Sequence, residues 1–70
     1  MLIGTYTAKY LGKTMLGFIN SREYLIKIGK DNYCYGIEGL TDLTENNDVS
    51  TAYITYASEK SIKRSWNIEE

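Results

Sequence analysis

Alternation of apolar and polar side chains with a period of two recurs along this sequence, and it favours a fold built mainly from strands. The alternation runs through Leu2–Tyr10, Glu23–Ile28 and Val49–Ala57, which are rich in aromatic and β-branched residues. A further strand, from Tyr33 to about Glu38, is expected after a turn cluster at Gly29–Asn32. The side chains expected to face the core are Tyr6, Ala8, Tyr10, Tyr24, Ile26, Ile28, Ala52, Ile54 and Tyr56.

Two longer segments between these strands lack the alternation. Leu11–Arg22 contains apolar residues without a sustained period, which predicts a long irregular loop or distorted hairpin that folds over one end of the sheet. Gly39–Asp48 is polar and acidic, with only Leu40 and Leu43 available for burial, so we expect a connecting loop there.

The pattern changes to that of a helix at Ser58, a residue type that caps helix N-termini. Glu59 suits the positive end of the helix dipole, and basic residues follow near the other end. Ile62 and Trp66 are four residues apart and therefore share one apolar stripe. We predict a short C-terminal helix over about 59–67 that lies across the open end of the sheet.

A chain of 70 residues is long enough for one domain only, because separate cores appear at several times this length. We therefore expect residues 1–70 to form a single mainly β domain. A flat sheet of four strands would leave two exposed edges, which closure removes. The prediction is a small, strongly bent barrel of four to five strands with a short C-terminal α-helix.

Several runs of residues also resemble a known class of protein. These runs are Ala8–Thr14, Leu16–Phe18, Arg22–Ile28 and Tyr56–Ser58, with Ile62 and Trp66 after them. Over nearly the whole chain, the sequence resembles small Src-homology-3-like barrel proteins of phages and prophages of Gram-positive bacteria. The resemblance implies an Src-homology-3-like barrel and a phage-related origin, and it carries over no catalytic or binding residue.

The charge and residue counts narrow the functional classes. With 8 basic and 9 acidic residues, the net charge of −1 gives no general attraction to nucleic acid. The sequence has no histidine, the usual general base near neutral pH. A single cysteine, Cys34, cannot form an internal disulfide, which favours a reducing compartment, the cytoplasm. Together with the resemblance to phage proteins, this implies the cytoplasm of the bacterial host. No apolar run approaches the roughly 20 residues that span a bilayer, and no export signal is evident, so we expect no membrane association.

Candidate catalytic and metal-binding groups lack the partners that such chemistry needs. Cys34 has no histidine to act as its base. The acidic residues between Glu38 and Asp48 do not have the spacing of a calcium loop. Gly12-Lys13-Thr14 resembles the end of a phosphate-binding loop, but Thr7 occupies the position of the earlier glycine. We predict no enzymatic activity, no metal and no cofactor.

Two binding hypotheses remain. The first is a protein-binding module that uses Tyr53 and Phe18, because aromatic residues are frequent at the centre of interfaces. The alternative is a small nucleic-acid-binding barrel in which exposed tyrosines stack on bases. Its phosphate contacts would be Lys13, Arg22, Lys27 and Lys30.

The first hypothesis leads. Its expected partner is a larger host or phage protein, and inhibition of a bacterial defence protein fits a small phage-related chain. The oligomeric state is left open between monomer and homodimer, because an exposed strand edge can pair with its copy.

Overall fold

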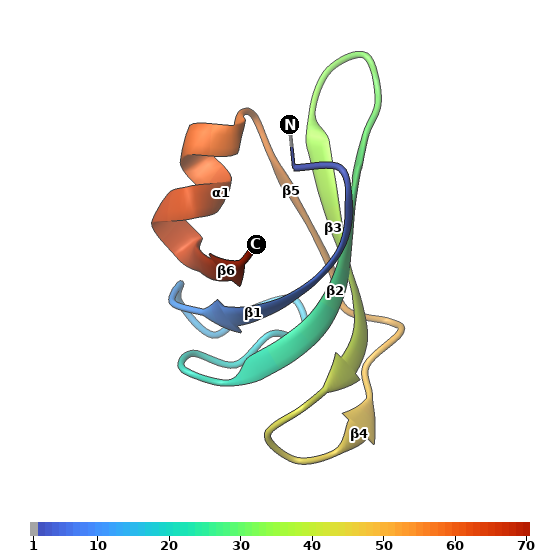
Figure 1. The fold of residues 1–70 in the computed structure, drawn as a ribbon, viewed down its shortest axis with the longest axis vertical. Helices are drawn as coiled ribbons and strands as arrows, with labels where there is room; N and C mark the ends of the chain where they lie inside the picture. The colour runs from blue at the N-terminus through green and yellow to red at the C-terminus, as the bar shows by residue number, and fades with distance from the viewer. Residues whose placement is uncertain (1) are drawn as a thin grey trace.

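Six strands form one antiparallel sheet, and a short helix lies beside it, in the computed structural model, which describes residues 2–70 (Figure 1). The elements in chain order are β1 (Gly4–Tyr10), β2 (Glu23–Lys30), β3 (Tyr35–Asp42), β4 (Asn47–Asp48), β5 (Tyr53–Tyr56), α1 (Glu59–Ser65) and β6 (Trp66–Glu69). This confirms the predicted mainly β fold with a short helix near the C-terminus.

The sheet is not closed into a barrel, so the prediction of a barrel is wrong in that respect. Its strand order is β4-β3-β2-β1-β6, and β5 pairs with β3 beside β4. The chain passes from β5 to β6 through α1, which contacts both strands, and these two strands, which a closed barrel would pair, do not pair with each other. A side-chain hydrogen bond links the two strands instead, because Nε1 of Trp66 donates to Oη of Tyr56 over 3.0 Å.

The predicted loop Gly39–Asp48 is mostly strand, because β3 continues to Asp42 and β4 follows a short turn. At Gly39 the backbone of the next segment comes close: an added Cβ would lie 2.8 Å from the carbonyl oxygen of Val49. The predicted strand Val49–Ala57 is shorter than expected. The N–H of Ala52 donates to the carbonyl of Val49 over 2.8 Å, which makes a turn, and β5 begins only at Tyr53.

The turn between β2 and β3 lies two residues later than predicted, since β2 extends to Lys30 and β3 begins at Tyr35. Oδ1 of Asp31 accepts the backbone N–H groups of Tyr33 (2.7 Å) and Cys34 (2.9 Å). An aspartate that binds the backbone two and three residues ahead stabilises a turn at its own position.

The helix begins as predicted, with the side chain of Ser58 accepting the N–H of Ser61 over 3.2 Å. It ends at Ser65 because Trp66 has an extended backbone, with φ −137° and ψ 131°. The last four strand residues, Trp66–Glu69, pair with β1, and the sequence did not predict this strand. Within residues 2–70, no helix has the length and apolar character that crossing a membrane takes.

Aromatic rings fill the centre of the core. The ring of Trp66 lies 4.8 Å from Tyr10, 5.0 Å from Phe18 and 6.1 Å from Tyr24, measured between centroids. The side chains predicted to face inward on β2 are all buried; on β1 and β5, Tyr6 and Tyr56 are only partly so. The core therefore depends on rings contributed by β1, β2, β6 and the loop between β1 and β2.

Candidate functional site

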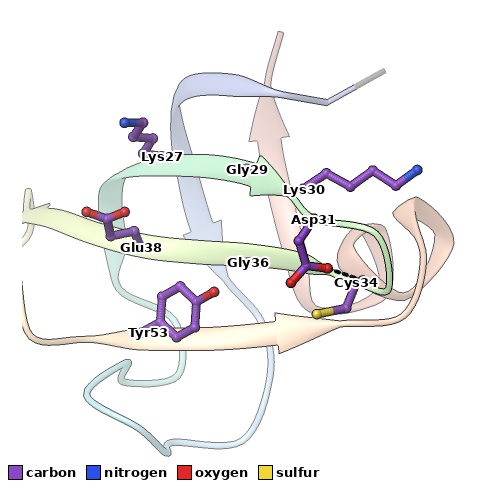
Figure 2. A pocket seen from close by; sticks show the side chains of 8 residues that line it. All are labelled: Lys27, Gly29, Lys30, Asp31, Cys34, Gly36, Glu38 and Tyr53. Atoms are coloured by element: carbon purple, nitrogen blue, oxygen red, sulfur yellow. Dashed lines mark hydrogen bonds between the residues drawn. The ribbon is translucent and has the colours of Figure 1, made fainter.

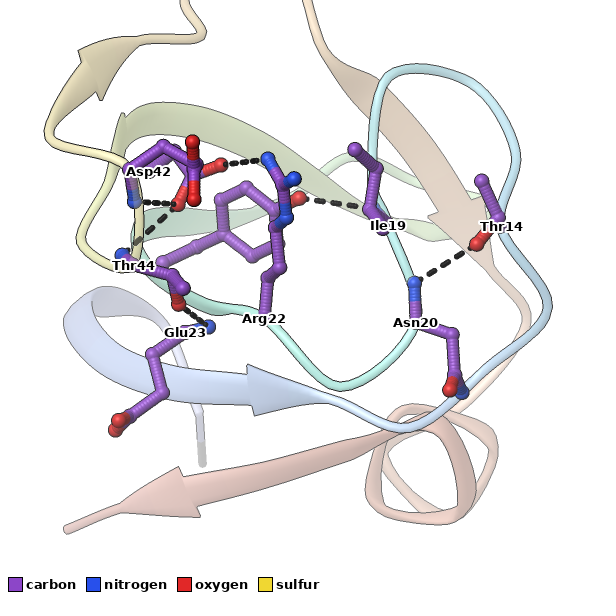
Figure 3. Close-up of polar contacts among 9 residues, drawn as sticks. Thr14, Ile19, Asn20, Arg22, Glu23, Asp42 and Thr44 are labelled. Atoms are coloured by element: carbon purple, nitrogen blue, oxygen red, sulfur yellow. Dashed lines mark hydrogen bonds and ion pairs between the residues drawn. The ribbon is translucent and has the colours of Figure 1, made fainter.

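Side-chain hydrogen bonds hold the loop Leu11–Arg22, which joins β1 to β2 (Figure 3). The backbone N–H of Asn20 donates to Oγ1 of Thr14 over 2.9 Å. Its side-chain amide donates to the carbonyl oxygens of Leu11 (3.2 Å) and Gly12 (2.9 Å). Because these bonds satisfy polar backbone groups within the loop itself, the loop is a structured element rather than a loose connection.

Three aromatic side chains fix this loop to the core. Oη of Tyr10 donates to the carbonyl of Lys13 over 2.6 Å, and Oη of Tyr24 accepts the N–H of Ile19 over 2.8 Å. The side chain of Phe18 is 0% exposed and lies among the core rings. The prediction that Phe18 contacts a partner is therefore wrong: its ring fills the core and no partner can reach it.

The tip of the loop is a tight turn that holds a leucine in an unfavourable conformation. Met15 and Phe18 exchange two backbone hydrogen bonds of 2.9 Å, and between them Leu16 has φ 53° and Gly17 has φ 92°. Positive φ at both central residues is typical of a type I′ turn, which prefers Asn-Gly. Leucine in the left-handed region costs about 1–2 kcal/mol, because its Cβ approaches the following carbonyl.

This tip presents apolar side chains to solvent. The side chain of Leu16 is 57% exposed. The exposed apolar residues of the loop, which we call the apolar loop surface, are Leu11, Met15, Leu16 and Ile19. Several exposed apolar side chains on one structured loop make that loop a candidate contact site.

The C-terminal end of the loop is anchored by a partly buried ion pair (Figure 3). Nη1 of Arg22 lies 3.0 Å from Oδ2 of Asp42, a buried residue, and Oδ1 of Asp42 accepts the N–H groups of Thr44 (2.9 Å) and Glu45 (3.0 Å). Burial of the Asp42 carboxyl acts to raise its pKa, but the hydrogen bonds from Glu45, Arg22 and Thr44 outweigh burial, and the pKa is lowered. Arg22 therefore has a structural partner within the chain.

The lowered pKa of Asp42 makes stability depend on acid pH. The folded-state pKa lies below the ordinary value of 3.8, so the stabilisation is complete above that value and is lost as the pH falls through the folded-state pKa. We expect the urea midpoint to fall as the pH is lowered from about 5 to about 2. An Asp42→Asn variant should show a smaller fall over this interval. Equal pH dependence in the two proteins would contradict the role of this carboxylate.

A second surface lies on the outer face of β2, β3 and β5. A groove of about 310 Å³, which we call the sheet-face groove, is lined by Lys27, Gly29, Lys30, Asp31, Cys34, Gly36, Glu38 and Tyr53 (Figure 2). Tyr53 is 53% exposed, as its place on the outer face of β5 predicts. Its ring lies over Gly36: a Cβ added to that glycine would approach Cζ of Tyr53 to 2.8 Å.

The sheet-face groove carries charges of both signs. Lys27 and Glu38 are direct cross-strand neighbours on β2 and β3. Backbone hydrogen bonds from Cys34 and Tyr33 lower the pKa of Asp31, so its carboxylate is ionised at neutral pH. Two lysines therefore share the groove with two carboxylates, which gives no net attraction for a phosphate chain.

The structure divides the predicted nucleic-acid residues between two places. Lys27 and Lys30 line the sheet-face groove, beside Tyr53 from the protein-binding hypothesis. Lys13 and Arg22 lie in the loop between β1 and β2, and Arg22 is paired with Asp42. The predicted basic residues thus form no single patch around an aromatic side chain.

The structure also shows where the candidate catalytic and metal-binding groups lie. Cys34 is partly buried at one end of the groove, where its N–H binds Asp31. In the part of the chain that the structure describes, no three His, Cys, Asp or Glu side chains gather in a metal-ligating arrangement.

The sequence did not lead us to predict the apolar loop surface as a contact site. Its four members lie within nine positions, Leu11 to Ile19, with neither a helical nor a strand period. A segment with that many large apolar residues and no period cannot turn all of them toward one core, and this was the available signal.

We also compared the chain with known proteins. Neither the family models, nor the curated proteins, nor the solved structures give a match to this sequence.

Proposed function

We propose that this chain is a non-enzymatic protein-binding module and that the apolar loop surface is its main contact. The observation that carries this proposal is the tip of the loop, where Leu16 is both exposed and held at positive φ. Strained backbone at an exposed site that the surrounding bonds enforce is a feature of binding elements. The same bonds mean that little conformational entropy is lost when the loop is covered by a partner.

Burial of the apolar loop surface by a partner can supply enough free energy for binding. Complete burial of one leucine, isoleucine or methionine side chain contributes about 1.5–3 kcal/mol. The apolar loop surface offers four such side chains, each already partly covered by its own chain. The exposed side chains of the apolar loop surface can be buried against an apolar surface of a larger protein.

We place this module in the context of the sequence resemblance to phage proteins. A single small domain with a rigid apolar tip can act by occupying a surface of a larger host or phage protein. Inhibition of a bacterial defence protein is the specific form of this proposal.

Nucleic-acid binding remains the second candidate, because Lys27 and Lys30 lie in one groove with the half-exposed Tyr53. An aromatic ring beside basic residues is the arrangement that stacks on bases and contacts phosphates. Asp31 and Glu38 in the same groove oppose it.

Replacement of Leu16 by glycine tests the proposal. Glycine adopts positive φ without strain, so we expect Leu16→Gly to keep its unfolding free energy within about 1 kcal/mol of the parent. Loss of the side chain should weaken partner binding by about tenfold or more, as truncation of a central contact does. The partner is captured from nuclease-treated bacterial lysate, purified and titrated against both proteins by calorimetry.

The matched control reverses the groove charges with Lys27→Glu and Lys30→Glu. Rim charges mainly affect the association rate, so this variant should retain binding at moderate salt. The proposal is wrong if the double variant abolishes binding while Leu16→Gly has no effect. It is also wrong if material is captured from untreated lysate but none from the nuclease-treated lysate.

A further inference from the structure

Two glycines face each other at the floor of the sheet-face groove. Gly29 on β2 and Gly36 on β3 are cross-strand partners, and both lack positive φ. Glycine inside a strand weakens it, and one recognised reason for its presence is the close approach of another group. A group that approaches the outer face of the sheet closely would explain why both positions are glycine.

The structure supplies that explanation for Gly36 only. The ring of Tyr53 covers Gly36 so closely that an added Cβ would lie 2.8 Å from Cζ. Gly29 has no such cover, because a Cβ added there finds no atom within 4 Å. An aromatic ring over a strand glycine restores the packing that the missing side chain loses. The uncovered half of the floor, over Gly29, is open and leaves room for a second ring.

An unused ring lies next to the groove. Tyr33, in the turn between β2 and β3, is 90% exposed, the largest exposure among the large exposed apolar and aromatic residues. Its neighbours Asp31 and Cys34 line one end of the groove. Because Tyr33 lies in the turn at this end, its exposed ring is available to the groove of a second copy when the two outer faces meet.

We propose that the chain forms a symmetric dimer in which Tyr33 of each copy covers Gly29 of the other and packs beside Tyr53. A two-fold interface uses the same patch on both copies, so the patch must be complementary to itself. The lining of the sheet-face groove is compatible with this condition, because it carries two lysines, Lys27 and Lys30, and two carboxylates, Asp31 and Glu38, so two copies of the face meet without a net like charge. This contact is separate from the apolar loop surface, so it goes beyond the proposed function and can hold or fail independently.

The dimer should be weak. One aromatic side chain buries about 150–250 Å², so two rings and their surroundings bury less than the roughly 1,200–2,000 Å² of a standard interface. We therefore expect the dimer only at high protein concentration, and it should be measurable when the concentration reaches about 1 mM.

Sedimentation equilibrium and NMR of the isolated chain test this dimer. We expect the average mass to rise toward twice 8.0 kDa with concentration, together with shifts of the Gly29 and Gly36 amide signals. Tyr33→Ala removes the ring, and Gly29→Val fills its place in open space, so each should stay folded and lower the association constant by at least about tenfold. A mixture of the two variants restores one of the two contacts, so it should associate more strongly than either alone.

Leu16→Gly is the control, because it alters only the apolar loop surface and should dimerise like the parent. A chain that stays monomeric at about 1 mM without shifts at the two glycines overturns the proposal. So does a dimer that Tyr33→Ala leaves intact or that Leu16→Gly abolishes. If N-acetyltryptophanamide shifts the Gly29 signal of a strictly monomeric chain, the groove accepts a ring from elsewhere and the dimer is refuted.

Discussion

Replacement of Trp66 by alanine should lower the free energy of unfolding by about 3–5 kcal/mol, as removal of a buried large aromatic side chain does. Trp66 is 2% exposed, and its ring lies between Tyr10 and Phe18 at 4.8 and 5.0 Å. The variant also loses the hydrogen bond to Tyr56 that links β6 with β5. Small domains have a total stability of about 5–15 kcal/mol, so a large part of it would be lost. Urea denaturation followed by circular dichroism measures the change.

A milder variant separates the ring from its hydrogen bond. Trp66→Phe keeps an aromatic ring in the core but removes the donor to Tyr56, and it should therefore cost clearly less than the alanine variant. If Trp66→Ala melts within a few degrees of the parent, the ring does not pack in the core and α1 is not held there.

Phe18→Ala is expected to have an effect of similar size, about 3–5 kcal/mol, because this ring is fully buried. The ring lies 5.7 Å from Tyr10 and 5.1 Å from Tyr24, so its loss opens a cavity beneath the loop. Thermal unfolding should show a lower melting temperature. The Ile19 amide should lose protection from hydrogen exchange, because the loop is loosened.

Met15→Ala is the matched control for Phe18→Ala, since Met15 is the exposed partner of Phe18 in the same hairpin. Substitutions of exposed residues usually change stability by less than about 0.5 kcal/mol. Similar small losses from both variants would show that Phe18 lies at the surface and would return it to the list of contact residues.

The strand faces could be predicted from the sequence because their period is local. Tyr24, Ile26 and Ile28 lie where the alternation of β2 puts them. The end of β3 could not be predicted, because Asp42 is buried by contacts with Arg22, twenty positions earlier in the chain. A polar residue stabilised by distant partners has the same local pattern as a loop residue. The strand β6 was missed for a similar reason: its four residues depend on β1 for pairing.

For the candidate site, too, only the features that follow from a local period could be predicted from the sequence. Tyr53 could be placed on the outer face by alternation along β5, and it is exposed there. Phe18 and Leu16 are two positions apart in an irregular loop, yet one is fully buried and the other is exposed. No period separates them, and only the tight turn with Leu16 at positive φ sends their side chains in different directions.

The position of Trp66 in β6 has a consequence for synthesis of the chain. β1, β2 and β3 are synthesised before Trp66, whose ring packs beside Tyr10, Phe18 and Tyr24. A nascent chain that stops short of Trp66 has an incomplete core and exposes apolar surface to chaperones and proteases. Folding of β1, β2 and β3 into a complete core therefore has to wait for β6, the last strand that the structure describes.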